Sequence, residues 1–418
     1  MKPEAMLRQK PIDYSTIYID MDSFFASVEQ YYNPRLRNKP VGVATGSTMG
    51  SSIIAASYIA KRAGIYTGIR VGEAIGLCPQ LEIVGGNPSR YRRVHNEFMS
   101  VLHSTICRVR ARGIDEAYLK VPSYAQSQEP VFALCKAIKA SIYNLYSEHI
   151  NCSIGIASNI WLAKMAASYN KPNGLFCVTR ANLPTFYSNF KLTDLTGVGH
   201  RMASQFVYRE INTPLNLYSA SWRLLGKYFG VNGHKWYLRL RGYEVDDLPL
   251  IERKSLGHQV TVTGLKTANL YKITTYCIKI AEVLGYRLRE NMLFAEGLIV
   301  QLAYIDDVYF NYKLNKLPAF SSNYLIVHYI NVLLKKHKYI SKLKRISITL
   351  IDLTSLQQLN FLPASFEPGT AALSEAIDVL ENKYGSKVVL SASSWAEQSF
   401  SLDKIGFATD EMRKSAQH

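Results

Sequence analysis

The chain has 418 residues, of which 48% are hydrophobic and 19% charged, a balance that is typical of a globular protein and excludes a disordered one. Lys and Arg number 49 against 32 Asp and Glu, and the net charge of +17 favours a polyanionic partner, nucleic acid before an anionic membrane, although some basic proteins use such charge only for solubility. The 6 cysteines form no Cys-x-x-Cys pair and the apolar segments are too short to span a bilayer, so we expect no zinc site, no membrane partner and a cytoplasmic, nucleoid-associated location.

The first predicted element is a strand that ends in two aspartates. Apolar residues alternate with Tyr18, Asp20 and Asp22, a pattern typical of a half-buried strand that presents carboxylates on one face. Ser23 is expected to cap a helix that begins directly after it. Carboxylates at such a strand end suit Mg²⁺, although an isolated Asp-x-Asp is often no more than a solvated strand end.

Strands and helices alternate up to about residue 180, which predicts a mixed α/β catalytic unit with a small inserted subdomain. Gly, Ser and Thr concentrate between residues 42 and 52 and indicate a small hairpin there. The further predicted elements are helices at 58–64, 72–79, 90–109, 131–149 and 161–169 and a buried strand at 152–157.

A second acidic segment, Gly113-Ile-Asp-Glu-Ala-Tyr-Leu119, complements the first. In a regular strand Asp115 and Glu116 would face opposite sides, so both serve one site only if the chain turns or twists there, which Gly113 permits. Together with Asp20 and the carbonyl oxygen of Met21, they could hold two Mg²⁺ ions. A triphosphate could lie against Tyr58, Lys61, Arg62 and Lys171. This set of groups is typical of in-line phosphoryl transfer.

Short helices are predicted between residues 180 and 246. The segment 192–201 carries Gly197 and Gly199 in a turn between two helices, and exposed N–H groups before a helix N-terminus can hold a DNA phosphate without reading the base sequence. A weaker copy of this turn lies at 230–234. A plain helix–helix turn is the alternative for both copies.

A polar, proline-containing stretch predicts an interdomain linker at 247–254. The elements predicted beyond it are a strand at 257–262, a helix at 270–289, strands at 296–305 and 308–314, a helix at 322–336 and a strand at 345–350. They make a β-α-β-β-α-β domain over 255–353. Positive charge concentrates there and favours a surface that follows phosphates over a merely solvated helix end; the residues are Lys335, Lys336, Lys344 and Arg345.

Residues 354–418 are predicted as a C-terminal tail with one helix at 371–383. A short peptide in this tail could dock in extended form into an apolar pocket of a partner, and an ordinary domain edge explains it equally well. Its residues are Gln358, Leu359, Phe361 and Leu362.

Four motifs in this order resemble those of the bacterial Y-family, the lesion-bypass or translesion DNA polymerases. They are Asp20-Met-Asp-Ser-Phe-Phe-Ala-Ser-Val-Glu29, Ala56-Ser-Tyr-Ile-Ala-Lys61, Ile114-Asp-Glu-Ala-Tyr-Leu119 and Ala163-Lys-Met-Ala-Ala-Ser-Tyr-Asn-Lys-Pro-Asn-Gly174. The resemblance implies an α+β right-hand polymerase. Its expected parts are a palm with a mixed sheet plus helices at 1–22 and 79–178, small fingers at 23–78, a helical thumb with a helix-hairpin-helix at 179–246 and a little finger at 255–353.

The resemblance also implies roles for single residues. Asp20, Asp115 and Glu116 would be the catalytic metal ligands, for two Mg²⁺ ions or alternatively Mn²⁺. Phe24 and Phe25 would both belong to the nucleotide-binding site, with Phe25 as the steric gate beneath the sugar, whereas a core position is the alternative and fits Phe24 better. The triphosphate contacts would be Tyr58, Lys61, Arg62 and Lys171. Lys61 and Ile59 stand where the family commonly has Arg and Glu, which predicts a weaker hold on the nucleotide.

The implied reaction is template-directed transfer of a nucleotide from a dNTP to a primer 3′-OH, with release of pyrophosphate and tolerance of damaged bases. The implied partners are primer-template DNA, a dNTP and a sliding clamp, although the clamp peptide has its Phe and Leu in exchanged order. A catalytically silent adaptor that binds DNA and clamp is one alternative, but such a relative would lack the acidic triad. A nucleotide cyclase is another, and it would explain neither the Gly-x-Gly turn nor the basic C-terminal domain.

Overall fold

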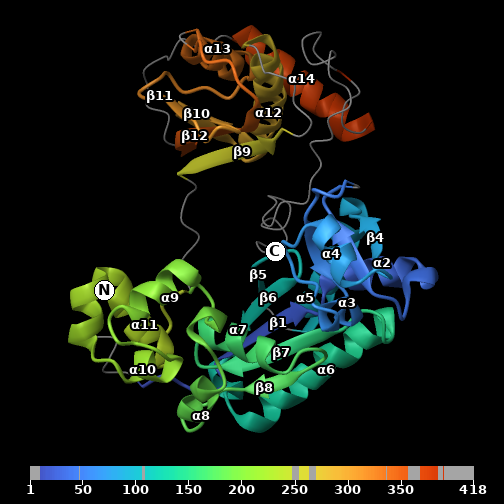
Figure 1. Ribbon diagram of the computed structural model, residues 1–418, viewed down its shortest axis with the longest axis vertical. Coiled ribbons are helices and arrows are strands. Elements are labelled where there is room, and N and C mark those ends of the chain that lie inside the picture. Colours follow the sequence, from blue (N-terminus) through green and yellow to red (C-terminus); the bar gives the residue numbers. More distant parts are fainter. Residues whose placement is uncertain are drawn as a thin grey trace. The chain divides into compact units, whose positions relative to one another are not determined.

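The computed structural model describes residues 10–46, 48–105, 109–246, 254–262, 270–335, 337–355, 368–384 and 389 (Figure 1). The chain divides into two compact units, residues 1–249 with 403–418 and residues 250–402. Each unit is described by itself. Among the described helices, none combines the length and apolarity that crossing a bilayer requires.

The first unit is built on a five-stranded sheet with the order β5-β6-β1-β7-β8 (Figure 1). Its strands are β1 (Thr16–Met21), β5 (Val109–Ala111), β6 (Glu116–Lys120), β7 (Cys152–Ala157) and β8 (Leu175–Cys177). The central strand β1 runs antiparallel to both β6 and β7, whereas β8 is parallel to β7. The predicted strand with the two aspartates is therefore the middle of a sheet.

Helices cover both faces of β1. Ile17, Ile19 and Met21 pack in a core with helices α2 (Phe24–Tyr32), α5 (Pro88–Thr105) and α6 (Gln128–Tyr146). Tyr18 packs on the other face with helix α7 (Ile160–Tyr169). All six residues of β1 are buried. The prediction of a half-buried strand was thus wrong, because the aromatic body of Tyr18 also lies in a core. The predicted helix at 90–109 was too long, since Val109 begins β5.

Helix α7 lies very close to strand β7. A Cβ atom at Gly155 of β7 would come within 2.0 Å of the carbonyl oxygen of Ala163 and 2.2 Å of the amide nitrogen of Ala167. Only glycine allows the backbone of a helix to approach a strand in this way. The side chain of Asn159 begins the helix by accepting a hydrogen bond from the Leu162 N–H at 2.7 Å.

A second, three-stranded sheet has the order β3-β2-β4. The predicted hairpin is present as β2 (Val41–Ala44) and β3 (Ile53–Ala56), followed by α3 (Tyr58–Arg62) and α4 (Val71–Leu77). Strand β4 (Glu82–Gly85) was not predicted, and it pairs in parallel with β2. This sheet therefore extends past residue 78, where the sequence placed the end of the fingers. Two short 3₁₀ helices are η1 (Pro34–Leu36) and η2 (Ser123–Ala125).

The rest of the first unit is helical, as predicted. Its elements are α8 (Leu183–Ser188), η3 (Leu192–Asp194), α9 (His200–Val207), α10 (Pro214–Ser219) and α11 (Trp222–Leu240). Gly230 interrupts α11 with φ 57° and ψ −138°, so the predicted second glycine turn is a break between two helical segments. Trp236 and Phe206 pack in one core with α7.

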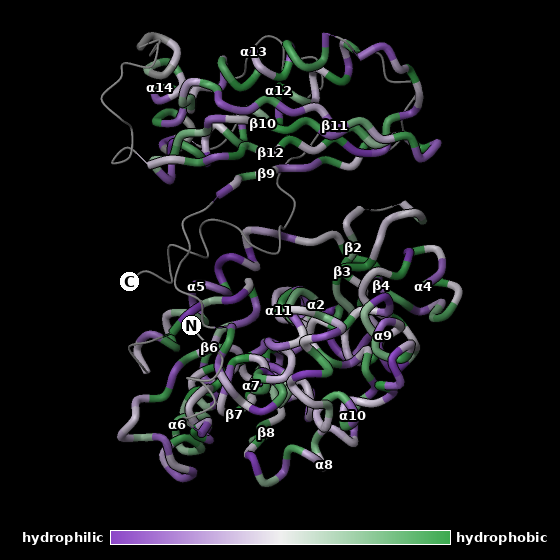
Figure 2. The backbone as a smooth tube through the Cα atoms, turned by 90° about the vertical axis from the view of Figure 1, so that its left-hand side faces the viewer, coloured by the Kyte–Doolittle hydropathy of each residue, from purple (hydrophilic) through white to green (hydrophobic). Residues whose placement is uncertain are grey.

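The second unit has the predicted order of elements: β9 (Ser255–Thr261), α12 (Leu270–Glu290), β10 (Leu293–Tyr304), β11 (Tyr309–Leu314), α13 (Asn323–Leu334) and β12 (Leu343–Ser355). The strands form an antiparallel sheet with the order β11-β10-β12-β9. Helices α12 and α13 cover one side of this sheet (Figure 2). A further helix, α14 (Pro368–Tyr384), corresponds to the helix predicted at 371–383.

Candidate active site

The two acidic segments meet at one end of the first sheet. Asp20 of β1 and Glu116 of β6 are directly opposite each other in the antiparallel register. Asp115 precedes β6, and its carbonyl oxygen accepts a hydrogen bond of 2.9 Å from the Met21 N–H. The chain turns just before this point, where the N–H groups of Arg112 and Gly113 both donate to the carbonyl oxygen of Glu116. The turn that the sequence required at Gly113 is present.

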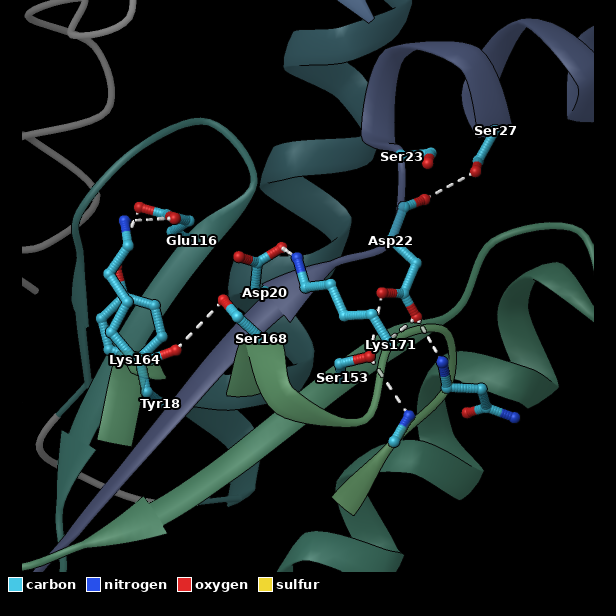
Figure 3. A network of polar contacts seen from close by, with 12 residues as sticks. Tyr18, Asp20, Asp22, Ser23, Ser27, Glu116, Ser153, Lys164, Ser168 and Lys171 are labelled. Atoms are coloured by element: carbon cyan, nitrogen blue, oxygen red, sulfur yellow. Dashed lines mark hydrogen bonds and ion pairs between the residues drawn. The ribbon is translucent and has the colours of Figure 1, made fainter. Parts of the chain in front are cut away.

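Two lysines hold two of these carboxylates (Figure 3). Lys171 Nζ donates to Oδ1 of Asp20, and Lys164 Nζ donates to Oε1 of Glu116 at 2.6 Å. The hydroxyl of Tyr18 donates to the other oxygen of Glu116 at 2.8 Å. Lys171 was predicted as a site residue, whereas Lys164 and Tyr18 were missed. The available signals were that Tyr18 alternates with Asp20 on one face of β1 and that Lys164 lies in the same motif as Lys171.

Burial shifts the charge states of these groups. It raises the pKa of Asp20, although Lys171 acts in the opposite direction. Burial, together with the neighbouring Asp20 and Glu116, raises the pKa of Asp115 to about 7. Burial would also raise the pKa of Glu116, but Lys164, the Tyr18 hydroxyl and Lys171 together outweigh it and leave that pKa below its usual value. Asp115 is therefore the carboxyl of the three that most readily holds a proton near neutral pH.

The donor set fits a hard cation, because it consists of carboxylate oxygens in a partly buried site. Among the described residues, no group of three His, Cys, Asp or Glu side chains is already arranged as a metal site. One oxygen of Asp20 and one of Glu116 are already paired with the ammonium groups of Lys171 and Lys164.

The raised pKa of Asp115 predicts an unusual stability profile for the metal-free protein. Between about pH 4 and pH 7 the folded state binds more protons at this carboxyl than the unfolded state does, so stability falls as the pH rises through this window. Asp115→Asn should therefore leave the free energy of unfolding unchanged near pH 4 and raise it by about 1–3 kcal/mol at pH 8. Urea unfolding in EDTA at both pH values measures this difference. Equal destabilisation at both would contradict the assignment.

Three of the residues predicted to contact the triphosphate, Tyr58, Lys61 and Arg62, lie on helix α3. The hydroxyl of Tyr58 donates to Oδ1 of Asp22 at 3.1 Å, and Lys61 Nζ donates to Oγ of Ser23 at 2.8 Å. Lys61 Nζ also lies 4.7 Å from the centre of the Tyr58 ring. The polar ends of both side chains thus reach the turn between β1 and α2, and this turn follows Asp20 in the chain. Arg62 is exposed to solvent.

Ser23 is the N-cap residue of α2, as the sequence predicts, but its side chain does not cap the helix. It has a left-handed backbone with φ 47°, and its side chain accepts no hydrogen bond from the first turn of α2. Its hydroxyl accepts the bond from Lys61 instead. The position of the cap was therefore predicted, and the partner of its side chain was not.

Phe24 and Phe25 begin α2, and the structure buries both rings in one core. Phe24 is 3% exposed and Phe25 is 6% exposed. The Phe25 ring lies 4.5 Å from the ring of Tyr91, whose hydroxyl donates to Oε1 of Glu29 at 2.8 Å. Tyr91, which is itself held by the buried carboxylate of Glu29, therefore fixes the position of the Phe25 ring.

Comparison with known proteins adds to this geometry. The model of the impB/mucB/samB family matches residues 19–168. DNA polymerase IV of Streptococcus agalactiae (serotype Ia) is 31% identical over 294 residues, which cover 69% of this chain and 80% of that protein. DNA polymerase IV 1 of Halalkalibacterium halodurans is 30% identical over 294 residues, which cover 69% of this chain and 70% of that protein. The chain belongs to the Y-family of translesion DNA polymerases.

Solved structures agree in fold. A chimera of the Y-family polymerases Dbh and Dpo4 matches with a TM-score of 0.68 and 23% identity, covering 81% of this chain and 99% of that chain. An insertion ternary complex of Dbh DNA polymerase matches with a TM-score of 0.58 and 22% identity, with the same coverage. The α+β fold expected from the Y-family resemblance is confirmed.

In this Y-family member the Gly-x-Gly turn of the predicted thumb connects η3 to α9. Gly197 has φ 89°, and Gly199 precedes the first residue of α9 with open space around its Cα. The turn is fixed to α7, because Trp161 Nε1 donates to the carbonyl oxygen of Thr196 at 2.8 Å. Both glycines are exposed, so the backbone at this turn is accessible to a ligand.

The basic residues predicted to bind DNA lie in the second unit. Lys335, Lys344 and Arg345 are exposed. Arg345 alternates along β12 with buried Ile346, so it points to the side of the sheet that the helices leave uncovered. Lys344 Nζ lies 3.9 Å from Oδ1 of Asp307. Lys336 and the four residues of the predicted clamp peptide, Gln358, Leu359, Phe361 and Leu362, lie outside the described residues.

Proposed function

We propose that this Y-family protein performs template-directed nucleotidyl transfer with two divalent ions, joining a dNTP to a primer 3′-OH and releasing pyrophosphate. The meeting of Asp20, Asp115 and Glu116 at the ends of β1 and β6 is the observation that carries the proposal. These carboxylates, with the carbonyl oxygen of Met21, would hold Mg²⁺ or Mn²⁺. When bound, the ions lower the pKa of the attacking hydroxyl and neutralise charge on the triphosphate.

The two lysines supply the second part of the proposal. In the absence of metal, Lys171 and Lys164 compensate the negative charge of Asp20 and Glu116. A lysine side chain is flexible and carries a point charge, so Lys171 can leave Asp20 and turn towards the phosphates of a nucleotide. Tyr58 and Lys61 make hydrogen bonds at the turn after β1 and would contact the same phosphates.

DNA would be held by backbone and side-chain contacts to phosphates. The N–H groups after Gly197 and Gly199 can bind one phosphate without base specificity. The uncovered side of the second sheet, with Arg345, offers charge for others. Contacts of this kind hold damaged and undamaged templates equally well, which suits translesion synthesis. Binding to a sliding clamp through residues 357–362 stays a prediction.

The contribution of the second unit to DNA binding can be measured separately from catalysis. Lys344→Ala with Arg345→Ala should lower the affinity for primer-template DNA uniformly across sequences and reduce the slope of log K against log salt by about one for each lost phosphate contact. Fluorescence anisotropy titrations at several KCl concentrations give this slope. Lys383→Ala on α14, which removes one exposed positive charge elsewhere in the unit, is the matched control. An unchanged slope in the double variant would remove these residues from the DNA-binding surface.

Primer extension by the purified protein tests the proposed function directly. We expect extension of a primer on an undamaged template and past an abasic site when Mg²⁺ and dNTPs are present, and none in EDTA or without a template. An adaptor that only binds DNA would show no extension under any of these conditions. Nucleotide turnover without primer-template would instead favour a cyclase.

A further inference from the structure

Asp22 is a buried carboxylate that the proposed metal site does not use. It follows β1 directly and is 2% exposed. Its carboxylate accepts hydrogen bonds from the Ser153 hydroxyl at 2.9 and 3.1 Å (Figure 3). It also accepts from the Tyr58 hydroxyl at 3.1 Å and from the backbone N–H of Asn173 at 2.6 Å. These partners come from helix α3, strand β7 and the loop after α7. One side chain therefore links three segments that are far apart in the sequence.

The loop that follows α7 is held at a second point. Lys139 Nζ donates to the carbonyl oxygens of Cys152 at 2.9 Å, Asn173 at 2.8 Å and Gly174 at 3.3 Å. The N–H of Gly174 donates to the Ser153 hydroxyl at 3.1 Å. The backbone two and three residues after Lys171 is therefore fixed from both sides, by Asp22 and Ser153 on one and by Lys139 on the other.

The chemistry at Asp22 calls for a carboxylate. The backbone N–H of Asn173 can only donate, and it approaches Oδ2, whereas Tyr58 approaches Oδ1. A carboxylate accepts at both oxygens, but an asparagine would offer one oxygen and one NH₂ group. With its oxygen towards Asn173, asparagine would face Tyr58 with a donor. The substitution therefore keeps the loop contact but replaces the charged acceptor of the Tyr58 hydroxyl by a neutral NH₂ group, so that Tyr58 must turn its hydroxyl to accept a weaker bond.

We propose that Asp22 is a positioning residue that sets Tyr58 and the loop carrying Lys171 relative to each other, so that both meet the triphosphate of the incoming nucleotide together. The inference rests on the proposed function, because it assigns Tyr58 and Lys171 to the triphosphate. Asp22 itself touches neither metal nor nucleotide in this role. It makes the triphosphate site a single preorganised unit built from α3 and the loop after α7.

Single-nucleotide incorporation tests this role, with the KM for dNTP, kcat and the affinity for primer-template measured separately. Asp22→Asn should raise the KM for dNTP by about tenfold, the effect of exchanging a hydrogen bond to a charged carboxylate for one with a neutral amide, and leave the DNA affinity within twofold. Tyr58→Phe should raise the KM to at least a similar degree. The double variant should be no worse than the more affected single variant, because both changes act on the same hydrogen bond.

Ser27→Ala is the matched control, since it removes a hydrogen bond of 2.7 Å to the backbone carbonyl of Asp22 and leaves the carboxylate contacts in place. It should not change the KM. If Asp22→Asn does not fold, Ser153→Ala takes its place, because it removes both hydrogen bonds from the Ser153 hydroxyl to the Asp22 carboxylate and should also raise the KM for dNTP. A wild-type KM in Asp22→Asn, additive effects in the double variant, or a loss of DNA affinity equal to the rise in KM would each overturn the positioning role. An inactive wild-type protein would instead overturn the proposed function on which the role depends.

Discussion

Primer extension by an Asp115→Ala and Glu116→Ala double variant is expected to fall by at least about a thousandfold, because two of the three carboxylates that would hold the metal ions are removed. Asp115 directly precedes β6 and Glu116 is its first residue, and neither belongs to the glycine turn or to the second unit. The affinity for primer-template DNA should therefore stay within about twofold of the wild-type value. Gel-based extension and anisotropy titration on the same preparations measure both quantities.

Glu129→Ala is a suitable control for this experiment, since Glu129 is an exposed carboxylate in the first turn of α6. It should leave extension unchanged. Retained extension by the Asp115 and Glu116 double variant would exclude these residues as metal ligands. Loss of DNA binding in parallel with activity would show that the substitutions disturb the sheet as a whole.

Phe25→Ala is expected to relax the selection against ribonucleotides by about a hundredfold in the ratio of kcat/KM for dNTP over rNTP, the order of discrimination that a close-packed apolar wall gives against one added hydroxyl. The ring of Phe25 lies against Tyr91, so it cannot retreat from a 2′-hydroxyl by moving deeper into the core. Incorporation of matched dNTP and rNTP pairs opposite one template base measures the ratio.

Truncation of Phe25 also removes a buried ring, so stability must be monitored alongside selectivity. Phe24→Leu serves as the control, because Phe24 lies in the same core and is only 3% exposed. It should lower stability and leave sugar selectivity unchanged. An unchanged ratio in Phe25→Ala would remove this residue from the role of steric gate.

Strong periodicity made much of the fold predictable. The β-α-β-β-α-β order of the second unit could be read from long apolar patterns, and the strand before Asp20 from its alternation. The predictions failed where a local pattern is compatible with both a helix and a strand. Val109 comes four residues after the end of α5, and the few apolar residues around it do not distinguish a helix end from a strand. Strand β4 has only four residues, and its partner β2 lies about 40 residues earlier.

The site was predictable where chemistry depends on residue type and spacing, and not where it depends on packing. Asp20, Asp115 and Glu116 were predicted as one set from their residue type, and the structure brings them together. The pairing of Lys164 with Glu116 is decided by how α7 lies on the sheet, which no local pattern encodes. The same holds for Asp22, whose three partners are brought together only by the tertiary fold. A local capping rule placed Ser23 correctly at the start of α2, but the partner of its side chain is set by a tertiary contact.

Gly155 lies outside this site, but it determines how closely α7, the helix that carries Lys164, approaches the sheet. The backbone of α7 rests on β7 where even a methyl group would clash with Ala163 and Ala167. A larger residue at this position would push the helix outwards and carry Lys164 away from Glu116. The size of this one neutral residue beneath the helix could therefore change how strongly Lys164 compensates the charge of Glu116, while every ionisable group of the site is retained. For the engineering of such an enzyme, side-chain volume at this position is a variable independent of the catalytic residues.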